Sequence, residues 1–487
     1  MLRRLALFMF TGLIAGSFAS AAIAQDALPP AVLQALQSAG VPKESFAAIA
    51  LPLGHAARPW RHRADVPMAP ASTMKLVTSI VALDRLGTKL RGSTELRSAA
   101  PLVAGTLQGD LVLKGGADPD LGVPQFWAML LELKQLGITT IAGDLLIDRT
   151  LFRPARMDLG VPPFDETPEF AYNDIPDAVQ LAGNLLTLDL SSVTGVVNVQ
   201  PLPALTGLDI TSRMSVTNTP CDDWDDGWKP PLVQRNGECT GIELQGSFPL
   251  GCSQRAELQL IDRVELADRL MRTLWQGLGG TWTGRARDAA APADARLFVR
   301  RLSRPWGELL RGMNKRSDNV LARLLFLQLG VAGMAEQPQA TTSELAAHEV
   351  RRWLAEKHIS DQGLVLDNGS GLSRSERITP LQLASMLKVA QASPFAPDLL
   401  MSLPVVGADG PRLKDSPAAG WARLKGGTLR DVVSLAGYVR DPQGRTWAVA
   451  MMINHDKASG ARPALYAWVD SFAREGPHRR APRGKTK

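Results

Sequence analysis

Apolar residues recur at helical spacing in several parts of the chain. Over residues 67–86 they fall every three or four positions before Gly87, which predicts a buried helix. A further helix is expected to start at Thr379-Pro380, because a capping residue precedes proline at the first helical position. The same periodicity predicts helices over 126–136, 306–329, 341–357 and 462–474.

Between residues 92 and 288 the pattern changes to short apolar runs separated by turn residues and Pro- or Gly-rich stretches. This region is expected to be mainly β, with the helix over 126–136 as an exception and a nested subdomain at about 190–265. The runs that predict strands are 107–113, 143–148, 193–199 and 208–214.

Three consecutive runs near the C-terminus, 421–429, 432–440 and 445–454, predict neighbouring strands. The last two are separated by Asp441-Pro442-Gln443-Gly444, which is typical of a hairpin turn. The helix over 462–474 is expected to cover that sheet. Since helices flank the β-rich region on both sides, we predict a discontinuous α+β domain.

The predicted domain consists of residues 25–91 and 289–475, and the β-rich region 92–288 is inserted into it. At 487 residues, the chain is long enough for two or three globular units.

The N-terminus has the three parts of a secretory signal peptide: Arg3 and Arg4, an apolar run to Phe18, and small residues up to Ala24. The run is short for a bilayer span, which disfavours the alternative of an uncleaved membrane anchor. We therefore expect cleavage after about Ala24 and a periplasmic mature protein.

The net charge of +6 is concentrated at the two ends of the chain. Without the leader arginines and the five basic residues between Arg479 and Lys487, the net charge is about −1. A nucleic-acid-binding surface is therefore not expected. The tail, 476–487, has no apolar period and is predicted to be disordered, with weak attraction to anionic membrane or wall polymers as the alternative.

Cys221, Cys239 and Cys252 are the only cysteines, and their number predicts one disulfide with one cysteine left over. Their spacing lacks the paired-ligand pattern of zinc sites, and no histidine lies nearby. We expect no metal and no cofactor. The sequence leaves the oligomeric state and the cysteine pairing open.

The first candidate for chemistry is Ser72 with Lys75. Three residues apart on a helix, both side chains lie on one face, where the amine can take the hydroxyl proton. Unpaired backbone N–H groups of a first helical turn suit a developing oxyanion. Alone, this spacing recurs by chance in many chains.

Two further motifs follow. Ser317-Asp318-Asn319 precedes an apolar helical stretch, where it can project polar groups into a cleft or simply cap the helix. Lys425-Gly426-Gly427-Thr428 lies inside a predicted strand, where glycines permit close approach of a ligand backbone or form a bulge. Each motif alone favours the structural alternative.

Together the three motifs match, in order, the Ser-x-x-Lys, Ser-Asp-Asn and Lys-Thr-Gly signature of penicillin-binding proteins, with the third altered. About 245 residues separate Ser72 from Ser317, so a domain-sized segment is inserted between them. This layout resembles the class C low-molecular-mass penicillin-binding proteins, the D-alanyl-D-alanine carboxypeptidase/endopeptidase family. The stretches 115–121, 143–144 and 367–374 are similar to that family as well.

The resemblance implies a penicillin-binding/β-lactamase-like transpeptidase domain, peptidoglycan peptides as substrates, and acylation and inhibition by β-lactams. It also implies that Ser72 is the nucleophile, Lys75 the general base, and Ser317 the proton relay to the leaving D-alanine. Asn319 would hold a substrate amide and assist Lys75. Lys425 would attract the terminal carboxylate.

The resemblance further implies that Gly427 and Thr428 line the substrate site, with the oxyanion hole formed by the N–H groups of Ser72 and Thr428. One departure from the family is Gly426, which stands where a hydroxyl residue usually helps to bind the substrate carboxylate. We expect a looser carboxylate site, with the Thr428 hydroxyl on the same strand face as a partial substitute.

Two alternatives remain. A serine β-lactamase of class A needs a glutamate base on a loop after Ser-Asp-Asn, and no Glu-x-x-Leu-Asn occurs there. The other is a catalytically weak, peptidoglycan-binding scaffold. Acidic residues at Asp165, Glu166 and Asp174 are expected to lie on a solvated loop, with contact to a peptide amino group as the alternative.

Overall fold

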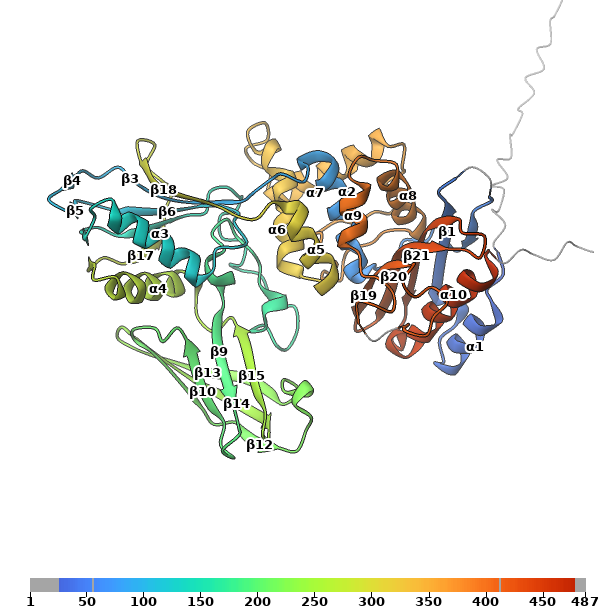
Figure 1. Ribbon diagram of the computed structural model, residues 1–487, viewed down its shortest axis with the longest axis horizontal. Helices are drawn as coiled ribbons and strands as arrows, with labels where there is room; N and C mark the ends of the chain where they lie inside the picture. Colours follow the sequence, from blue (N-terminus) through green and yellow to red (C-terminus); the bar gives the residue numbers. More distant parts are fainter. Residues whose placement is uncertain (1–25, 55–56, 411–412, 478–487) are drawn as a thin grey trace, which may run out of the picture.

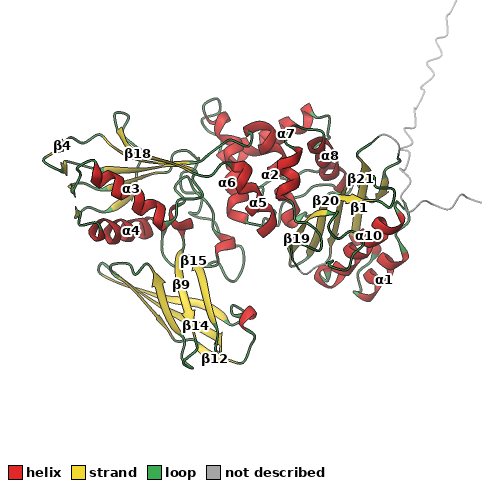
Figure 2. Ribbon diagram, in the orientation of Figure 1, coloured by secondary structure: helices red, strands yellow, loops and turns green. Residues whose placement is uncertain are grey.

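The computed structural model describes residues 26–54, 57–410 and 413–477, so the predicted signal peptide and residues 478–487 lie outside it. One body, on the right of Figure 1, is formed by the beginning and the end of the described chain. The middle of the sequence forms a second, more elongated part. Figure 2 shows that helices concentrate in the centre, next to the C-terminal sheet, whereas strands dominate the lower part of the molecule.

A five-stranded antiparallel sheet joins both ends of the chain (Figure 1). Lys425 pairs with Ala436 in it, and Ala48 pairs with Met451. Its inner strands are buried at nearly every position, since helices cover both faces, and they therefore form continuous apolar runs. The strand order is β19 (Arg423–Leu429), β20 (Val432–Arg440), β21 (Thr446–Asn454), β1 (Phe46–Pro52) and β2 (Trp60–His62).

Helices α1 (Pro30–Ser38) and α10 (Arg462–Glu475) cover one face of this sheet, where Trp468 packs in the same core as Trp447. The other face is covered by a layer of helices whose apolar sides form a second core. These helices are α2 (Met74–Leu86), α5 (Trp306–Arg316), α6 (Asn319–Gly330), α7 (Thr342–Glu356), α8 (Pro380–Gln391) and α9 (Ala396–Ser402).

The inserted segment contains a five-stranded sheet covered by helices α3 (Val123–Gln135) and α4 (Arg263–Gly277). Its order is β17 (Ala286–Asp288), β8 (Leu145–Asp148), β6 (Leu111–Gly116), β3 (Ser93–Ser98) and β18 (Arg296–Leu302). A small sheet lies beside it, ordered β16 (Thr281–Trp282), β7 (Thr140–Ile141), β5 (Thr106–Leu107) and β4 (Leu102–Val103).

The outer part of the insert is a pair of small sheets with a disulfide. Cys221 bonds to Cys252 and Cys239 is free and exposed, which confirms one bridge with one cysteine left over. One sheet is ordered β10 (Asn198–Leu202), β9 (Leu186–Ser191) and β15 (Ser253–Leu258). The other contains β11 (Leu208–Ser212), β14 (Cys239–Pro249) and β12 (Ser215–Thr217), with β13 (Trp228–Asn236) also paired to β14.

Two neighbouring strands connect the insert to the rest of the chain. β3 and β18 pair antiparallel and run side by side toward the central helices (Figure 1). Beyond them, Ser303 N donates to Gly92 O at 2.9 Å and Gly92 N donates to Ser303 Oγ at 2.9 Å. The sheet of the insert thus extends past the expected boundary at residue 288, to Leu302.

Several sequence predictions differ from the structure in their bounds. The predicted helix over 67–86 is wrong at its start, because α2 begins at Met74, after a single 3₁₀ turn, Ala71–Thr73. The helical stretch 306–329 is two helices, α5 and α6, separated at Ser317. The predicted strand over 193–199 falls mostly in the turn between β9 and β10.

Other predictions hold. Thr379 caps α8, as the Thr-Pro pair predicted, and the structure adds a reciprocal capping box with Gln382. Helix α4 was missed in a region predicted as β.

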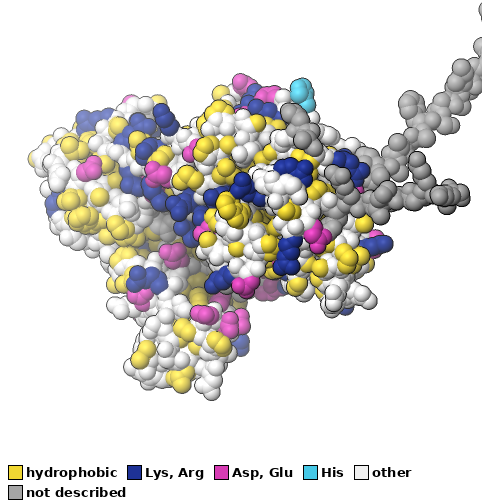
Figure 3. All heavy atoms as spheres, turned by 45° about the vertical axis from the view of Figure 1, so that its right-hand side comes forward, with side chains coloured by type: hydrophobic (Ala, Val, Ile, Leu, Met, Phe, Trp, Pro, Cys, Tyr) yellow, Lys and Arg dark blue, Asp and Glu magenta, His cyan; other side chains and the backbone are white. Residues whose placement is uncertain are grey.

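No helix in the described part of the chain is long and apolar enough to cross a membrane. On the face shown in Figure 3, lysine and arginine side chains are interspersed with acidic ones.

Candidate active site

Ser72 and Lys75 meet at the start of α2. Ser72 lies in the turn Ala71–Thr73, and Lys75 lies one turn further on with no exposed surface. Lys75 Nζ is 3.0 Å from Ser72 Oγ. Ala71 has a positive φ of 46°, a left-handed conformation that alanine rarely adopts. Strained backbone of this kind is common at functional sites.

The hydrogen bonds of Lys75 are compatible with a neutral amine. Its Nζ donates to Asn319 Oδ1 and to Ser370 O, each at 2.6 Å. Both partners are carbonyl oxygens and can only accept. A neutral amine has two N–H groups for these carbonyls, which leaves its lone pair for the Ser72 hydroxyl.

The electrostatic surroundings favour the same neutral state. Burial lowers the pKa of Lys75 well below its usual value, and the positive charge of Lys425 lowers it further. Glu376 and Asp318 act in the opposite direction, but burial is the largest effect. A neutral lysine next to a serine hydroxyl can act as a general base.

The loop that supplies the Ser370 carbonyl is folded around one buried carboxylate. Glu376 Oε1 accepts from the backbone N–H groups of 367–369, the shortest at 2.8 Å from Gly369, and Oε2 accepts from Gly371 N at 2.9 Å. Burial raises the pKa of Glu376 to about 7. A side chain at Gly371 would collide with Ala71 O at 1.8 Å, so this loop lies directly on the turn Ala71–Thr73.

Ser317 and Asn319 are presented by the break between α5 and α6. Ser317 adopts the left-handed conformation, with φ 62° and ψ 38°. Asp318 rather than Ser317 or Asn319 caps α6, with its carboxylate accepting from Leu321 N at 2.9 Å. The capping role suggested for this motif therefore belongs to Asp318, and the two flanking side chains are left for the cleft.

Lys425 comes from the edge strand β19 and reaches Ser317. Its Nζ donates to Ser317 Oγ at 2.7 Å and to Gly426 O at 2.9 Å. Burial lowers the pKa of Lys425 to about 7. Ser434 on β20 fixes the sheet to the start of the turn that carries Ser72, since its Oγ donates to Pro70 O at 2.6 Å.

The two glycines of β19 have different surroundings. A Cβ at Gly427 would lie 2.3 Å from Ser434 Oγ and 2.8 Å from Ser72 N. Only glycine therefore lets β19 lie this close to the turn that carries Ser72. A Cβ at Gly426 would meet only Leu435 Cδ2 at 3.7 Å and Ser434 O at 4.0 Å, which is ordinary contact. Only Gly427 is required by close packing.

The insert contributes backbone groups to the same cleft. Asn319 Nδ2 donates to Tyr172 O at 3.1 Å. One turn later on α6, Arg323 Nη1 donates to Asn173 O at 3.2 Å and to Asp174 O at 2.7 Å. The segment 172–174 therefore lies against the helix that carries Asn319.

The sequence predicted that Asp165, Glu166 and Asp174 lie on a solvated loop. For Asp174 this prediction is wrong. Asp174 is completely buried, faces Arg263 and Gln180, and has its pKa raised to about 6 by burial. Asp165 accepts from Tyr172 Oη at 2.6 Å. Glu166 is exposed and pairs across the cleft with Arg430 at 3.2 Å.

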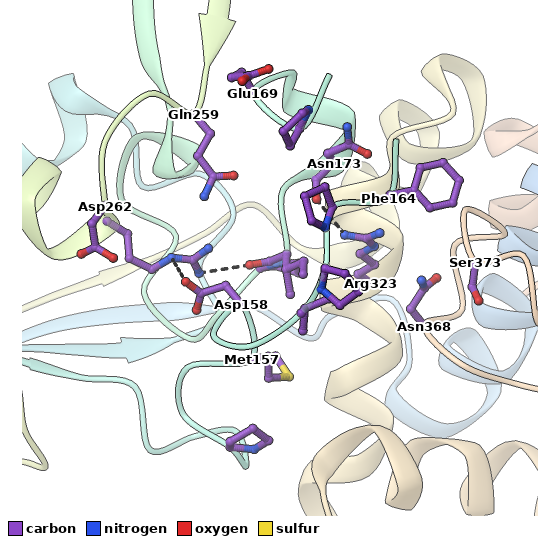
Figure 4. Close-up of a pocket in the computed structure, with 18 of the residues that line it drawn as sticks. Met157, Asp158, Phe164, Glu169, Asn173, Gln259, Asp262, Arg323, Asn368 and Ser373 are labelled. Atoms are coloured by element: carbon purple, nitrogen blue, oxygen red, sulfur yellow. Dashed lines mark hydrogen bonds and ion pairs between the residues drawn. The ribbon is translucent and has the colours of Figure 1, made fainter. Parts of the chain in front are cut away.

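Ser72, Ser317, Asn319 and Thr428 line one cleft of about 350 Å³, so most of the predicted site residues come together. A larger cavity, of about 1330 Å³, adjoins it and shares Phe164 and Arg374 with it. Figure 4 shows Arg323, Asn173 and Phe164 among the residues that line the larger cavity. The larger cavity is lined by no residue of the three motifs, whereas the smaller cleft is lined by residues of all three.

Sequence reasoning missed the functional use of Ser370, Glu376, Tyr172 and Arg323. Both Ser370 and Tyr172 contribute backbone carbonyls, which every residue has; Ser370 lies inside the family-like stretch 367–374, whereas no signal marked Tyr172. Glu376 lies two residues after the family-like stretch 367–374, and this position was the available signal.

Helices flank an antiparallel sheet, and a serine and a lysine at a helix start face an edge strand that carries a second lysine. This is the arrangement of the penicillin-binding serine hydrolases. The chain belongs to the D-Ala-D-Ala carboxypeptidase 3 (S13) family, which matches it over residues 31–472. The protein is thus a serine peptidase, and the family predicted from its motifs is confirmed.

Two relatives illustrate the similarity. The D-alanyl-D-alanine carboxypeptidase of Actinomadura sp. (strain R39) is 29% identical over 426 residues, which cover 83% of this chain and 76% of the relative. The D-alanyl-D-alanine carboxypeptidase DacB of Haemophilus influenzae is 27% identical over 399 residues, 80% of each chain. The crystal structure of penicillin binding protein 4 (dacB) from Haemophilus influenzae has a similar fold, with a TM-score of 0.73, 21% identity, and coverage of 91% and 98%.

Proposed function

We propose that this enzyme cleaves the D-Ala-D-Ala bond of peptidoglycan stem peptides, or the corresponding bond of peptide cross-links, through an acyl-enzyme on Ser72. We also propose that β-lactams acylate the same serine and inhibit the enzyme. The observation that carries this proposal is the position of the buried Lys75 Nζ, 3.0 Å from Ser72 Oγ and held there by the carbonyl oxygens of Asn319 and Ser370.

In the proposed acylation, Ser72 Oγ attacks the carbonyl carbon of the penultimate D-alanine while its proton passes to Lys75 Nζ. The negative charge that develops on the carbonyl oxygen is held by the backbone N–H groups of Ser72 and Thr428. Asn319 supports this step in two ways: its Oδ1 fixes Lys75, and the N–H of its amide that is not bonded to Tyr172 O is proposed to hold a backbone amide of the substrate.

Collapse of the tetrahedral intermediate breaks the C–N bond, and the nitrogen of the departing D-alanine takes the proton that Lys75 accepted, relayed by Ser317. Lys425, 2.7 Å from Ser317 Oγ, assists this relay and attracts the terminal carboxylate. Water then hydrolyses the ester, and the Ser72 hydroxyl is restored.

We further propose that the chain is exported to the periplasm. The signal-peptide pattern lies outside the described residues, but the Cys221–Cys252 disulfide suits an oxidising compartment. The proposed division into a catalytic unit and an insert is supported by separate apolar cores and by the paired strands that connect them. Weak attraction of the basic tail to anionic wall or membrane polymers stays a prediction.

The test uses the purified, signal-free protein with a labelled penicillin and with an N-acylated peptide that ends in D-Ala-D-Ala. We expect persistent labelling and D-alanine release, both lost in Ser72→Ala. Ser375→Ala, which changes an exposed serine beside the cleft loop, is the matched control and is expected to behave as wild type.

The other outcomes identify the alternatives. Absence of both labelling and D-alanine release in the folded wild-type protein would contradict the proposal and favour a peptidoglycan-binding scaffold. Rapid turnover of the penicillin, with no lasting label, would instead indicate a β-lactamase.

A further inference from the structure

The carboxylate end of the cleft lacks a hydroxyl that the backbone has room for. Gly426 has no positive φ, and a side chain there would make only ordinary contacts with Leu435 and Ser434. The glycine is therefore not imposed by the fold. A chain that binds a terminal carboxylate without that hydroxyl needs another group for the purpose.

Thr428 is the nearest candidate on the same strand, and it has a partner from outside the three motifs. Thr428 is exposed and lines the cleft together with Ser72 and Ser317. Arg462 Nη2 donates to Thr428 Oγ1 at 2.9 Å. This bond occupies an acceptor site of the hydroxyl and leaves its proton available for a carboxylate oxygen.

The position of Arg462 is unusual for a residue with only a structural role. It is the first residue of α10, where the helix dipole disfavours a positive side chain. Within residues 26–54, 57–410 and 413–477, no carboxylate lies within ion-pair distance of it. Its charge is therefore free to act on an anion at the cleft.

We propose that Thr428 and Arg462 together form the anchor for the substrate's terminal carboxylate, in place of the hydroxyl missing at Gly426. Thr428 donates its hydroxyl proton to the carboxylate. Arg462 is a positioning residue that orients this hydroxyl, polarises it and adds positive charge behind it. The preferred substrates are peptides with a free carboxylate after the scissile bond, and this proposal rests on the proposed peptidase function.

The test compares an N-acylated D-Ala-D-Ala peptide with its C-terminal amide in wild type, Arg462→Gln and Arg462→Lys. Loss of a charge-assisted contact of this kind is expected to raise KM for the free acid about tenfold, with little change in kcat. KM for the amide is expected to stay nearly unchanged, so that Arg462→Gln loses discrimination. Arg462→Lys should recover part of it by retaining the charge.

Two further variants make the result specific. Gly426→Thr in the Arg462→Gln background restores the missing hydroxyl and is expected to lower KM for the free acid again. Arg474→Gln, an exposed arginine in the last turn of the same helix, is the matched control and should behave as wild type. Thermal unfolding of each variant checks that the fold is retained.

The proposal is overturned if Arg462→Gln keeps the wild-type ratio between acid and amide. In that case the peptidase function stands, because wild type still releases D-alanine and still labels at Ser72. If wild type itself releases no D-alanine, the proposed function fails, and its failure is seen before any Arg462 variant is measured.

Discussion

Replacing Glu376 by glutamine is expected to change how the stability of the protein depends on pH. Glu376 is fully buried, and burial raises its pKa to about 7 from an ordinary value of 4.5. The folded protein therefore binds this proton more tightly than the unfolded chain does. The stability from this proton is fully present below about pH 4.5 and is lost as the pH rises through about 7.

The size of the effect follows from the difference between the two pKa values. A difference of about 2.5 units corresponds to about 3 kcal/mol between pH 4.5 and pH 8. Glutamine does not titrate, so the stability of the variant lacks this dependence on pH. In wild type, Oε2 accepts from Gly371 N–H. In the variant the amide nitrogen stands in that place, and because two donors then face each other, the lost hydrogen bond costs about 1–3 kcal/mol at every pH.

The assay is urea unfolding, followed by tryptophan fluorescence, at several pH values from 4.5 to 8. We expect Glu376→Gln to be clearly less stable than wild type at pH 4.5 and close to it, or more stable, at pH 8. Glu336→Gln, an exposed carboxylate-to-amide change, is the control. A stability difference between wild type and Glu376→Gln that stays constant over this range would refute the reasoning.

Three other outcomes are expected. First, KM for a D-Ala-D-Ala peptide should rise as the pH passes about 7, because Lys425 loses the charge that attracts the carboxylate; a flat profile from pH 6 to 8.5 would contradict this role. Second, replacing Cys221 and Cys252 by serine opens a link across 31 residues and should cost about 4 kcal/mol in urea unfolding, while penicillin labelling persists. Third, Gly371→Ala forces a Cβ to 1.8 Å from a backbone oxygen and should slow labelling at least about 100-fold, whereas Gly277→Ala, with open space, should not.

The parts of the fold that the sequence predicts are those set by local patterns. The capping box at Thr379, the C-terminal strands and the helix that bears Lys75 all follow from spacing within a few residues. Helix α4 also had a local signal, a capping Asp262 before apolar residues at helical spacing, but the strands around it led to a β assignment.

The parts that the sequence does not predict depend on contacts between distant segments. β1 is a continuous apolar run, and nothing near it indicates that it pairs with β21, close to the other end of the chain. The strained backbone at Ala71 lies against the loop at Gly371, 300 positions further along the chain, and such a contact has no local sequence signal. Backbone carbonyls such as Tyr172 O join the site only once the whole chain is folded.

The paired strands that connect the insert also affect the order in which the protein can fold. During synthesis the insert emerges complete while β19, β20 and β21 are still unmade, so the catalytic sheet cannot yet form around β1. An insert that folds at that stage brings Gly92 and Ser303 together. The long separation between the two halves of the catalytic unit is then reduced to a short connection, so the entropic cost of closing it is met before the catalytic sheet forms.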